Sequence, residues 1–188
     1  MNSTLWTAKS GLEAQQQRLA IISNNISNVN TTGYKRSRGA FETLLYQNLR
    51  QPGSESSANA QYTSGIMIGT GTSLVANPKD FSQGSLQKTD GQFDIAIEGA
   101  GFYKVNQPDG TEAYTRDGSF TINNQGELVT NYGSTIASGI TVPENSTDVH
   151  ISEDGRVVAE IGGVQQIIGT ITLTSFISPK GLKPIGKN

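Results

Sequence analysis

The sequence predicts an α+β protein, with a long amino-terminal coiled-coil-type helix, an extended arm and then an antiparallel all-β domain. Three observations support this: a heptad repeat of apolar residues at the start, a polar middle stretch without periodicity, and short β-type runs between glycine turns in the second half. The 188 residues fit one modest domain with extended appendages. We therefore expect three segments, at residues 1–33, 34–77 and 78–188.

The helix is predicted by two interleaved sets of residues spaced seven apart. Such a and d spacing is typical of a helix that lies along another helix. We expect about 25 residues of helix, about 38 Å long, ended by the polar run Asn28–Gly33. The two sets share an apolar character broken only at Gln15, and their apolar members are Leu5, Ala8, Leu12, Leu19, Ile22, Ile26 and Val29.

Two interpretations of this apolar stripe are open. The helix could pack on the core of its own domain, or it could pack on helices of other molecules. The stripe is narrow, and the next sixty residues contain no second helix with a matching face. We therefore favour a partner outside the chain.

The middle segment lacks a clear pattern. Residues 41–49 fit either a helix or an extended strand, and residues 51–65 (QPGSESSANAQYTSG) have the composition of a linker. Composition favours a flexible loop for this stretch. The alternative is an extended arm that is ordered by neighbouring molecules.

The second half alternates short β-type runs with turn residues. Asp-Gly and Gly-Gly pairs supply the positive φ angles that tight hairpins need. The predicted turns are Pro108-Asp109-Gly110, Asp117-Gly118, Asn124-Gln125-Gly126, Asp154-Gly155 and Gly162-Gly163. The predicted strands are residues 93–97, 102–105, 112–115, 119–123, 127–131, 156–161 and 166–177.

Composition argues against most enzyme classes. The chain has no cysteine and one histidine, His150, which we expect on an edge strand. Asp90, Asp94 and Glu98 lack calcium-ligand spacing and are expected to be turn and surface carboxylates. We predict no catalytic residues, no metal site and no cofactor.

Charge and hydropathy constrain the partners. The net charge is −2, and the three basic residues at positions 35, 36 and 38 are too few for a nucleic-acid surface. No apolar run approaches the roughly 20 residues of a membrane span. The amino terminus also lacks the pattern of a cleaved secretory signal.

Three blocks of sequence are more specific than these patterns. The first is ISNNISNVNTTGYK at residues 22–35, the second combines residues 81–86 with 94–103, and the third runs from 114–120 to 126–129. Together they resemble the bacterial flagellar rod and hook family, in the order expected for it. The residues that carry the first signature are Asn24, Asn25, Asn28, Gly33, Tyr34 and Lys35.

Within that family, residues 46–65 resemble the insertion of distal rod members, which includes Arg50, Gln51, Pro52 and Gly53. The resemblance implies a structural subunit, not an enzyme, whose arm lies against neighbouring subunits and stiffens a straight rod. It implies an inner tube wall of helices, an outer layer of β domains, and a homopolymer that transmits torque from motor to hook.

The same resemblance implies the surroundings of the subunit. Expected partners are proximal rod and hook-family proteins and the P-ring and L-ring bushing, in a rod that crosses the periplasm after flagellar type III export. Family members carry a carboxy-terminal helix that this sequence lacks, so we expect a partial sequence. The alternatives are a hook or proximal rod subunit, or a secreted carbohydrate-active or adhesin domain.

Overall fold

A computed structural model describes residues 3–57 and 60–186. It opens with helix α1 (Ser3–Ser27) and continues with antiparallel β-structure, so the predicted α+β class is confirmed. Among the described residues no helix is long and apolar enough to cross a membrane. The described chain forms two compact units, one containing residues up to Val29 together with Arg36–Asp80, the other containing Asn30–Lys35 and the residues from Phe81 onward.

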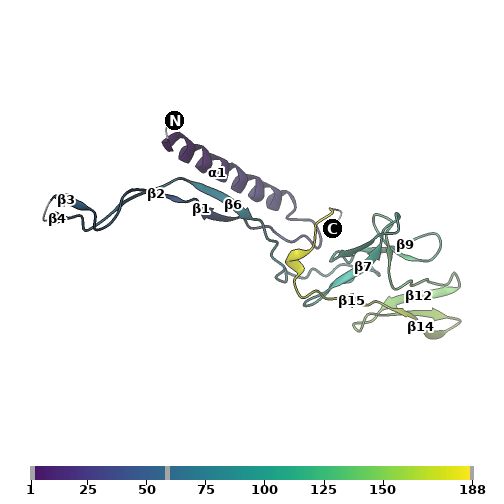
Figure 1. Cartoon of the computed structure of the whole chain (residues 1–188). Helices are drawn as coiled ribbons and strands as arrows, with labels where there is room; N and C mark the ends of the chain where they lie inside the picture. Colours follow the sequence, from purple (N-terminus) through teal and green to yellow (C-terminus); the bar gives the residue numbers. More distant parts are fainter. Residues whose placement is uncertain (1–2, 58–59, 187–188) are drawn as a thin grey trace. The chain divides into compact units, whose positions relative to one another are not determined.

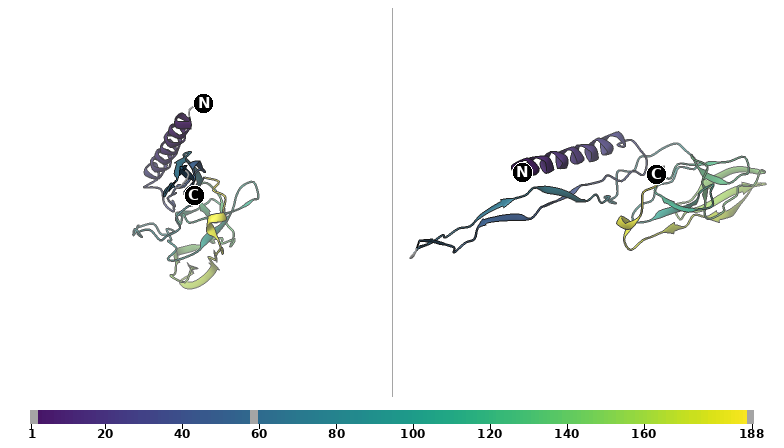
Figure 2. Two further views of the ribbon diagram at one scale, coloured as in Figure 1. Left: turned by 60° about the vertical axis from the view of Figure 1, so that its left-hand side comes forward. Right: turned by 45° about the horizontal axis from the view of Figure 1, so that its top comes forward.

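The first unit consists of α1 and one long β-hairpin. The outgoing strands are β1 (Ala40–Thr43), β2 (Tyr46–Arg50) and β3 (Glu55–Ser57), and the returning strands are β4 (Ala60–Gln61), β5 (Ile66–Gly69) and β6 (Thr72–Ala76). They pair as β1–β6, β2–β5 and β3–β4, so the arm is a single ribbon. Figures 1 and 2 show this ribbon running beside α1 and extending past the amino end of the helix.

The arm is therefore extended, and its backbone hydrogen bonds are made within the arm. Pairing keeps one register from Phe41–Leu74 to Asn48–Met67. Of the two conformations open for residues 41–49, the structure has the strand. The polar composition of residues 51–65 concealed this pairing, because a ribbon without a buried face needs no alternating pattern.

The second unit contains two antiparallel sheets. In the larger, the strands follow the order β15-β7-β11-β10-β9, with β8 also paired to β7, and the smaller has the order β12-β13-β14. The strands are β7 (Phe102–Asn106), β8 (Glu112–Thr115), β9 (Phe120–Ile122), β10 (Leu128–Thr130), β11 (Thr135–Ile136), β12 (Ser146–Ile151), β13 (Arg156–Ile161), β14 (Val164–Thr170) and β15 (Leu173–Thr174). A short 3₁₀ helix, η1 (Pro179–Gly181), follows them.

The core of this unit lies among the strands of both sheets. Leu128 and Val157 are its most completely buried large side chains. Tyr103 packs edge-on against Phe120, with ring centroids 5.2 Å apart, and its hydroxyl donates to the Ile95 carbonyl at 3.4 Å. Burial raises the pKa of Tyr103 to about 12, and the positive charge of Arg116 offsets part of that rise.

Most predicted strands are confirmed, and three predictions are corrected. Residues 93–97 form no strand and make only an isolated bridge from Asp94 to Ser119. The predicted hairpin turn at Asp117-Gly118 joins β8 and β9, which do not pair with each other. There the Asp117 carboxylate accepts a hydrogen bond from the Ser119 backbone, so an Asx turn takes the place of a hairpin. The predicted strand 166–177 is divided between β14 and β15.

The raised pKa of Tyr103 predicts how the free energy of unfolding changes at alkaline pH. Its raised pKa means that the folded state favours the neutral phenol, so its contribution is complete below about pH 10 and is lost as pH rises towards 12. Between pH 9 and 11.5, Tyr103→Phe should lose roughly 1 to 2 kcal/mol less stability than the parent in urea unfolding. Tyr132→Phe, at a tyrosine that is 58% exposed, is the control and should follow the parent. Parallel curves for all three proteins would contradict the assignment.

Candidate functional site

Helix α1 has three distinct faces. One carries the predicted apolar stripe, a second packs on the hairpin, and a third is polar and includes the Lys9–Glu13 pair at 3.5 Å. At 3.6 residues per turn, the apolar stripe and the hairpin face are separated by about a third of a turn. The helix is thus held by its own chain without using its apolar stripe.

The apolar stripe is exposed in the described chain. Ile22 is its least exposed large side chain, at 43%, and Leu12 reaches 73%. Ala8 is also exposed. Val29, 74% exposed, lies two residues beyond the end of α1. Each residue of the predicted stripe is therefore accessible in the single chain, and its role in assembly stays a prediction.

The hairpin face of the helix consists of small and partly polar residues. The Ser10 hydroxyl donates to the Thr7 carbonyl at 2.8 Å and accepts the Thr72 backbone N–H at 3.4 Å. Ala14 is the one α1 residue described as buried. Ile21 lies where a side chain at Gly39 would be, with its Cδ1 3.0 Å from the position of an added Cβ. Small residues therefore allow the helix to approach the strands closely.

Sequence reasoning missed this face. The positions that contact the hairpin recur at the same near-heptad spacing as the apolar stripe, and this repeat was the available signal. The repeat does not stand out as an apolar stripe because serine and asparagine occupy two of its four positions. The residues concerned are Ser10, Ala14, Ile21 and Asn25.

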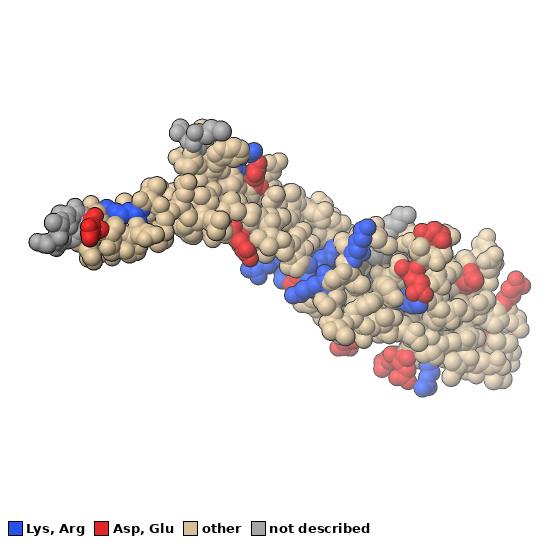
Figure 3. Space-filling model, in the orientation of Figure 1, with Lys and Arg blue, Asp and Glu red and all other residues tan. Residues whose placement is uncertain are grey.

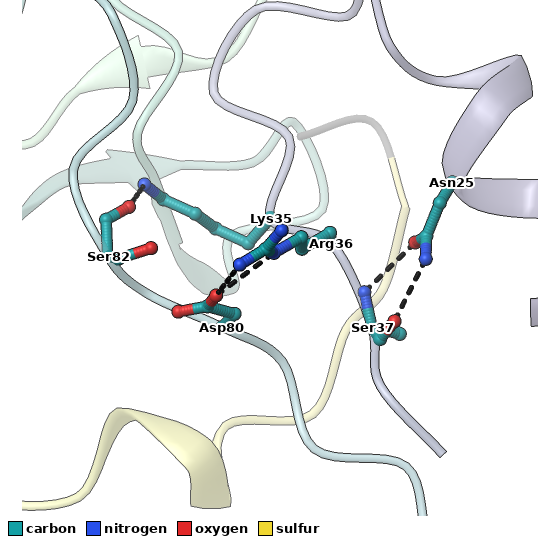
Figure 4. A network of polar contacts seen from close by, with 6 residues as sticks. All are labelled: Asn25, Lys35, Arg36, Ser37, Asp80 and Ser82. Carbon is teal, nitrogen blue, oxygen red and sulfur yellow. Dashed lines mark hydrogen bonds and ion pairs between the residues drawn. The ribbon is translucent and has the colours of Figure 1, made fainter. Parts of the chain in front are cut away.

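The signature residue Asn25 fixes the carboxyl end of the helix to the start of the hairpin (Figure 4). Its Nδ2 donates to the Ser37 carbonyl at 2.9 Å, and its Oδ1 accepts the Ser37 N–H at 3.0 Å. The carboxamide thus satisfies both backbone groups of one residue, as a neighbouring strand would do. Nearby, Asn28 Nδ2 donates to the Asn24 carbonyl at 2.9 Å and closes the last turn of α1.

Polar contacts also hold the root of the hairpin. Arg36 donates from Nε and Nη2 to one carboxylate oxygen of Asp80, at 3.0 and 2.8 Å (Figure 4). The Asp80 N–H donates to the Arg36 carbonyl at 2.9 Å, and the Arg38 N–H donates to the Pro78 carbonyl at 3.1 Å. The outgoing and returning segments of the hairpin are therefore already paired before β1 begins. Because Arg36 is 74% exposed, the ion pair adds at most about 1 kcal/mol.

The last three signature residues, Gly33, Tyr34 and Lys35, lie in the second unit, where they meet the second and third sequence blocks. Gly33 has φ 73°, and a Cβ there would come within 2.9 Å of the Asp117 backbone nitrogen. Lys35 Nζ donates to the Ser82 carbonyl at 2.8 Å (Figure 4). Tyr34, between these two residues in the sequence, is partly buried. Gly33 is required both by its backbone angle and by this close approach.

The second and third blocks are joined by two side chains. Gln83 Nε2 donates to the Ile97 carbonyl at 3.2 Å. Arg116 donates to the Gly99 carbonyl and to Gln83 Oε1. Residues 33–35 of the first block thus meet parts of the second and third blocks in the second unit. The bonds from Gln83 and Arg116 hold the Ile97 and Gly99 carbonyls in a segment that forms no strand.

The predicted arm residues lie at the end of β2 and between β2 and β3. Arg50 ends β2, and Gln51, Pro52 and Gly53 form the turn that follows. Between residues 40 and 76 the chain has only three charged side chains, Glu42, Arg50 and Glu55. Figure 3 accordingly shows a largely uncharged surface along the ribbon.

The histidine and the carboxylates that the sequence analysis considered for catalysis or metal binding do not form a site among the described residues. His150 is exposed on β12, an edge strand of the smaller sheet, as predicted. Asp94 accepts a hydrogen bond from the Thr89 hydroxyl at 2.8 Å. Across the described residues no three histidine or carboxylate side chains gather as a metal site would require.

Comparisons with known proteins address the same regions. A family model described as "Flagella basal body rod protein" matches residues 5–35, and another, "Flagellar hook protein FlgE/F/G D1 domain", matches residues 96–159. The flagellar basal-body rod protein FlgG of Buchnera aphidicola (Schizaphis graminum strain) is 47% identical over all of this chain and 73% of its own length. FlgG of Borreliella burgdorferi is 45% identical over all of this chain and 72% of its own.

The chain belongs to the FlgG family of flagellar basal-body rod proteins. It is a structural subunit of the flagellar rod in the basal body. The hook protein FlgE of Helicobacter mustelae is a more distant relative, 39% identical over 82% of this chain and 34% of its own length. The FlgG matches also span residues 36–80, the hairpin and its root, in full.

The Asn25 contact generates a prediction for the FlgG-family chain. Asn25→Asp keeps the shape but replaces the N–H donor with a carboxylate oxygen facing the Ser37 carbonyl. The first unit should lose about 1 to 3 kcal/mol of stability, and the Ser37 amide should exchange its hydrogen faster. Gln16→Glu makes the same chemical change at an exposed helix position and is the control. Unchanged exchange at Ser37 in Asn25→Asp would contradict the role given to this side chain.

Proposed function

We propose that this FlgG-family subunit polymerises helically into the distal rod, the drive shaft that transmits torque from motor to hook. The apolar stripe of α1 packs against helices of neighbouring subunits and of other rod and hook-family proteins, and these helices form the inner wall of a tube. Contacts that repeat without closing into a ring generate such a filament. The segments 1–33, 34–77 and 78–188 then serve as inner wall, connecting arm and outer layer.

The observation that carries this proposal is the exposure of the stripe on a helix that is already docked by another face. Full burial of a large apolar side chain contributes about 1.5 to 3 kcal/mol, and Leu5, Leu12, Leu19 and Ile26 are each more than 60% exposed. Rotating the helix to bury them on the hairpin would remove Asn25 and Ser10 from their hydrogen bonds. Burial by other molecules avoids that loss.

The hairpin supports contacts with neighbours on both of its faces. Tyr46 and Met67 are 61% and 53% exposed and lie on one face of the ribbon, whereas Leu45 and Ile68, 87% and 47% exposed, lie on the other. A two-stranded ribbon by itself is marginally stable in water. We infer that the arm lies between neighbouring subunits, where it makes the rod straight and stiff.

The location of the subunit follows from the same proposal. The rod crosses the periplasm, and the β-rich second unit faces outward, towards the P-ring and L-ring bushing. The subunit is exported through the flagellar type III system without a cleaved signal. Catalytic residues and cofactors have no part in this function. A hook or proximal rod subunit is the nearest alternative. The distal rod is favoured because the FlgG match covers all of this chain, whereas the hook-protein match covers 82% of it.

Substitutions in the stripe test the proposal. Leu12→Asp or Leu19→Asp places a charge where a neighbouring helix would exclude water, which costs several kcal/mol. Both variants should fail to form rods, with the β-rich unit still folded by circular dichroism. Ala20→Asp is the matched control, because Ala20 is exposed on the polar face that carries Lys9 and Glu13 and should assemble normally. Straight rods from both leucine variants, seen by electron microscopy, would refute the helical wall.

Deleting residues 54–64 tests the arm separately. The outgoing and returning segments approach closely where the tip begins, since a Cβ on Gly65 would lie 2.8 Å from Pro52 Cδ. Joining Gly53 to Gly65 should therefore leave β2 and β5 in place. Rods of the deletion variant should form but bend visibly more in electron micrographs. The melting temperature of the β-rich unit should stay unchanged. Rods as straight as the parent's would count against a stiffening arm.

A further inference from the structure

The ribbon changes character between Arg50 and Gly65. Regular pairing extends to Asn48–Met67, and a β-bulge then shifts the register so that Arg50 pairs with Ile66. Pairing resumes only in the tip, at Glu55–Gln61. Two short irregular segments, residues 51–54 and 62–65, therefore separate the tip from the rest of the arm. We call residues 50–54 and 62–65 the arm joint.

The backbone of the arm joint is closed by its own hydrogen bonds. Ser54 N–H donates to the Gln51 carbonyl at 3.3 Å and closes a turn in which Gly53 has φ 79°. Across the joint, the Gly53 N–H donates to the Tyr62 carbonyl at 2.8 Å and the Tyr62 N–H donates to the Ser54 carbonyl at 3.0 Å. The joint is therefore a defined structure and not a gap in the ribbon.

The two segments also approach each other very closely. A Cβ at Gly65 would lie 2.7 Å from the Arg50 carbonyl oxygen and 2.8 Å from Pro52 Cδ. Such distances exclude a side chain at this position. The close approach brings the Arg50 side chain beside the returning segment.

Arg50 spans the joint with its side chain. Its guanidinium carbon lies 3.7 Å from the centroid of the Tyr62 ring, and its Nη2 lies 3.5 Å from the Ser64 carbonyl oxygen. Its Nε is buried and, among the described residues, has no hydrogen-bond partner. The contact therefore depends mainly on the stacking of a planar cation on an aromatic ring, which is stabilising when the cation is partly removed from water.

We propose that Arg50 is a positioning residue that, by stacking on Tyr62, fixes the direction in which the tip of the arm points. Among the described residues the tip contains two residue pairs, Glu55–Gln61 and Ser57–Ala60, with a register shift between them, and such a short ladder is too weak to determine the orientation of the tip. The use of this direction, to aim the tip at a neighbouring subunit, rests on the proposed function. The fixed joint itself is a property of the single chain.

The absence of cysteine from the sequence allows a direct test in the isolated full chain. A double variant with Gln47→Cys and Glu55→Cys places one spin label on each side of the joint. Pulsed electron paramagnetic resonance then measures the distribution of distances between the two labels. With Arg50 present we expect a single narrow distribution. Arg50→Ala should widen the distance distribution at least twofold. Arg50→Lys keeps the positive charge but loses the planar guanidinium, and it should widen the distribution as well. Arg38→Ala, an exposed arginine at the root of the hairpin, is the matched control and should not.

A second pair of variants isolates the ring. Tyr62→Phe keeps the stacking surface and should give the narrow parental distribution, whereas Tyr62→Leu should widen it as Arg50→Ala does. Unchanged width in both Arg50→Ala and Tyr62→Leu overturns the proposal.

A third label pair detects unfolding of the hairpin. Glu42→Cys and Ser73→Cys lie opposite each other in β1 and β6, and their distance should stay narrow in every variant. If this distance widens together with the first, Arg50 supports the whole hairpin and the proposed joint is wrong. All these measurements use the unassembled chain, so their outcome is independent of whether rods form and of the stripe and deletion tests.

Discussion

The structure depends on how helix α1 divides its surface. Its small and amide side chains dock on the hairpin, and the Asn25 carboxamide pairs with the Ser37 backbone in the way a strand would. Because that docking fixes the rotation of the helix, the apolar stripe cannot turn inward. Exposure of Leu12 and Leu19 is thus a consequence of a satisfied intramolecular contact. A helix with no such contact could bury its stripe on any available apolar surface and would lose its specificity for neighbours.

A similar argument applies to the arm. A disordered arm would lose about 1 to 2 kcal/mol of backbone entropy for each residue that a neighbour ordered. Here the backbone is already paired from Ala40–Ala76 to the tip, so most of that loss is incurred on folding. Contact with a neighbour then mainly buries side chains such as Leu45 and Tyr46. A pre-paired ribbon also resists bending along its length better than a flexible chain, which agrees with the stiffening role proposed for the arm.

The sequence predicted those parts of the fold whose pattern depends on burial or on turns. The heptad repeat located α1 to within a few residues, and the positive-φ glycines at 110, 126, 155, 162 and 163 marked real turns. The hydrophobic pattern failed in the arm, because backbone pairing there needs no apolar face. It also failed near Asp94 and Gly118, where a few hydrogen bonds take the place of a strand. The docking face of α1 was missed because polar Ser10 and Asn25 share it with Ala14 and Ile21, so it shows no continuous apolar repeat. Arg50 was recognised only as part of a motif, since its stacking on Tyr62 joins residues twelve positions apart.

The signature residues acquire a common explanation as points where a force-transmitting chain is held. In the first unit, Asn25 ties the end of the helix to residue 37, and in the second, Gly33 and Lys35 tie the following segment to residues 117 and 82. Only a few residues separate these attachments, so little free chain lies between the helix and the β-rich unit. Each attachment uses the backbone of its partner, through a carbonyl, an N–H or a close approach that only glycine permits. These attachments therefore do not depend on the side chains of residues 37, 82 and 117, and three of the six signature residues, Asn25, Gly33 and Lys35, are the ones that reach across.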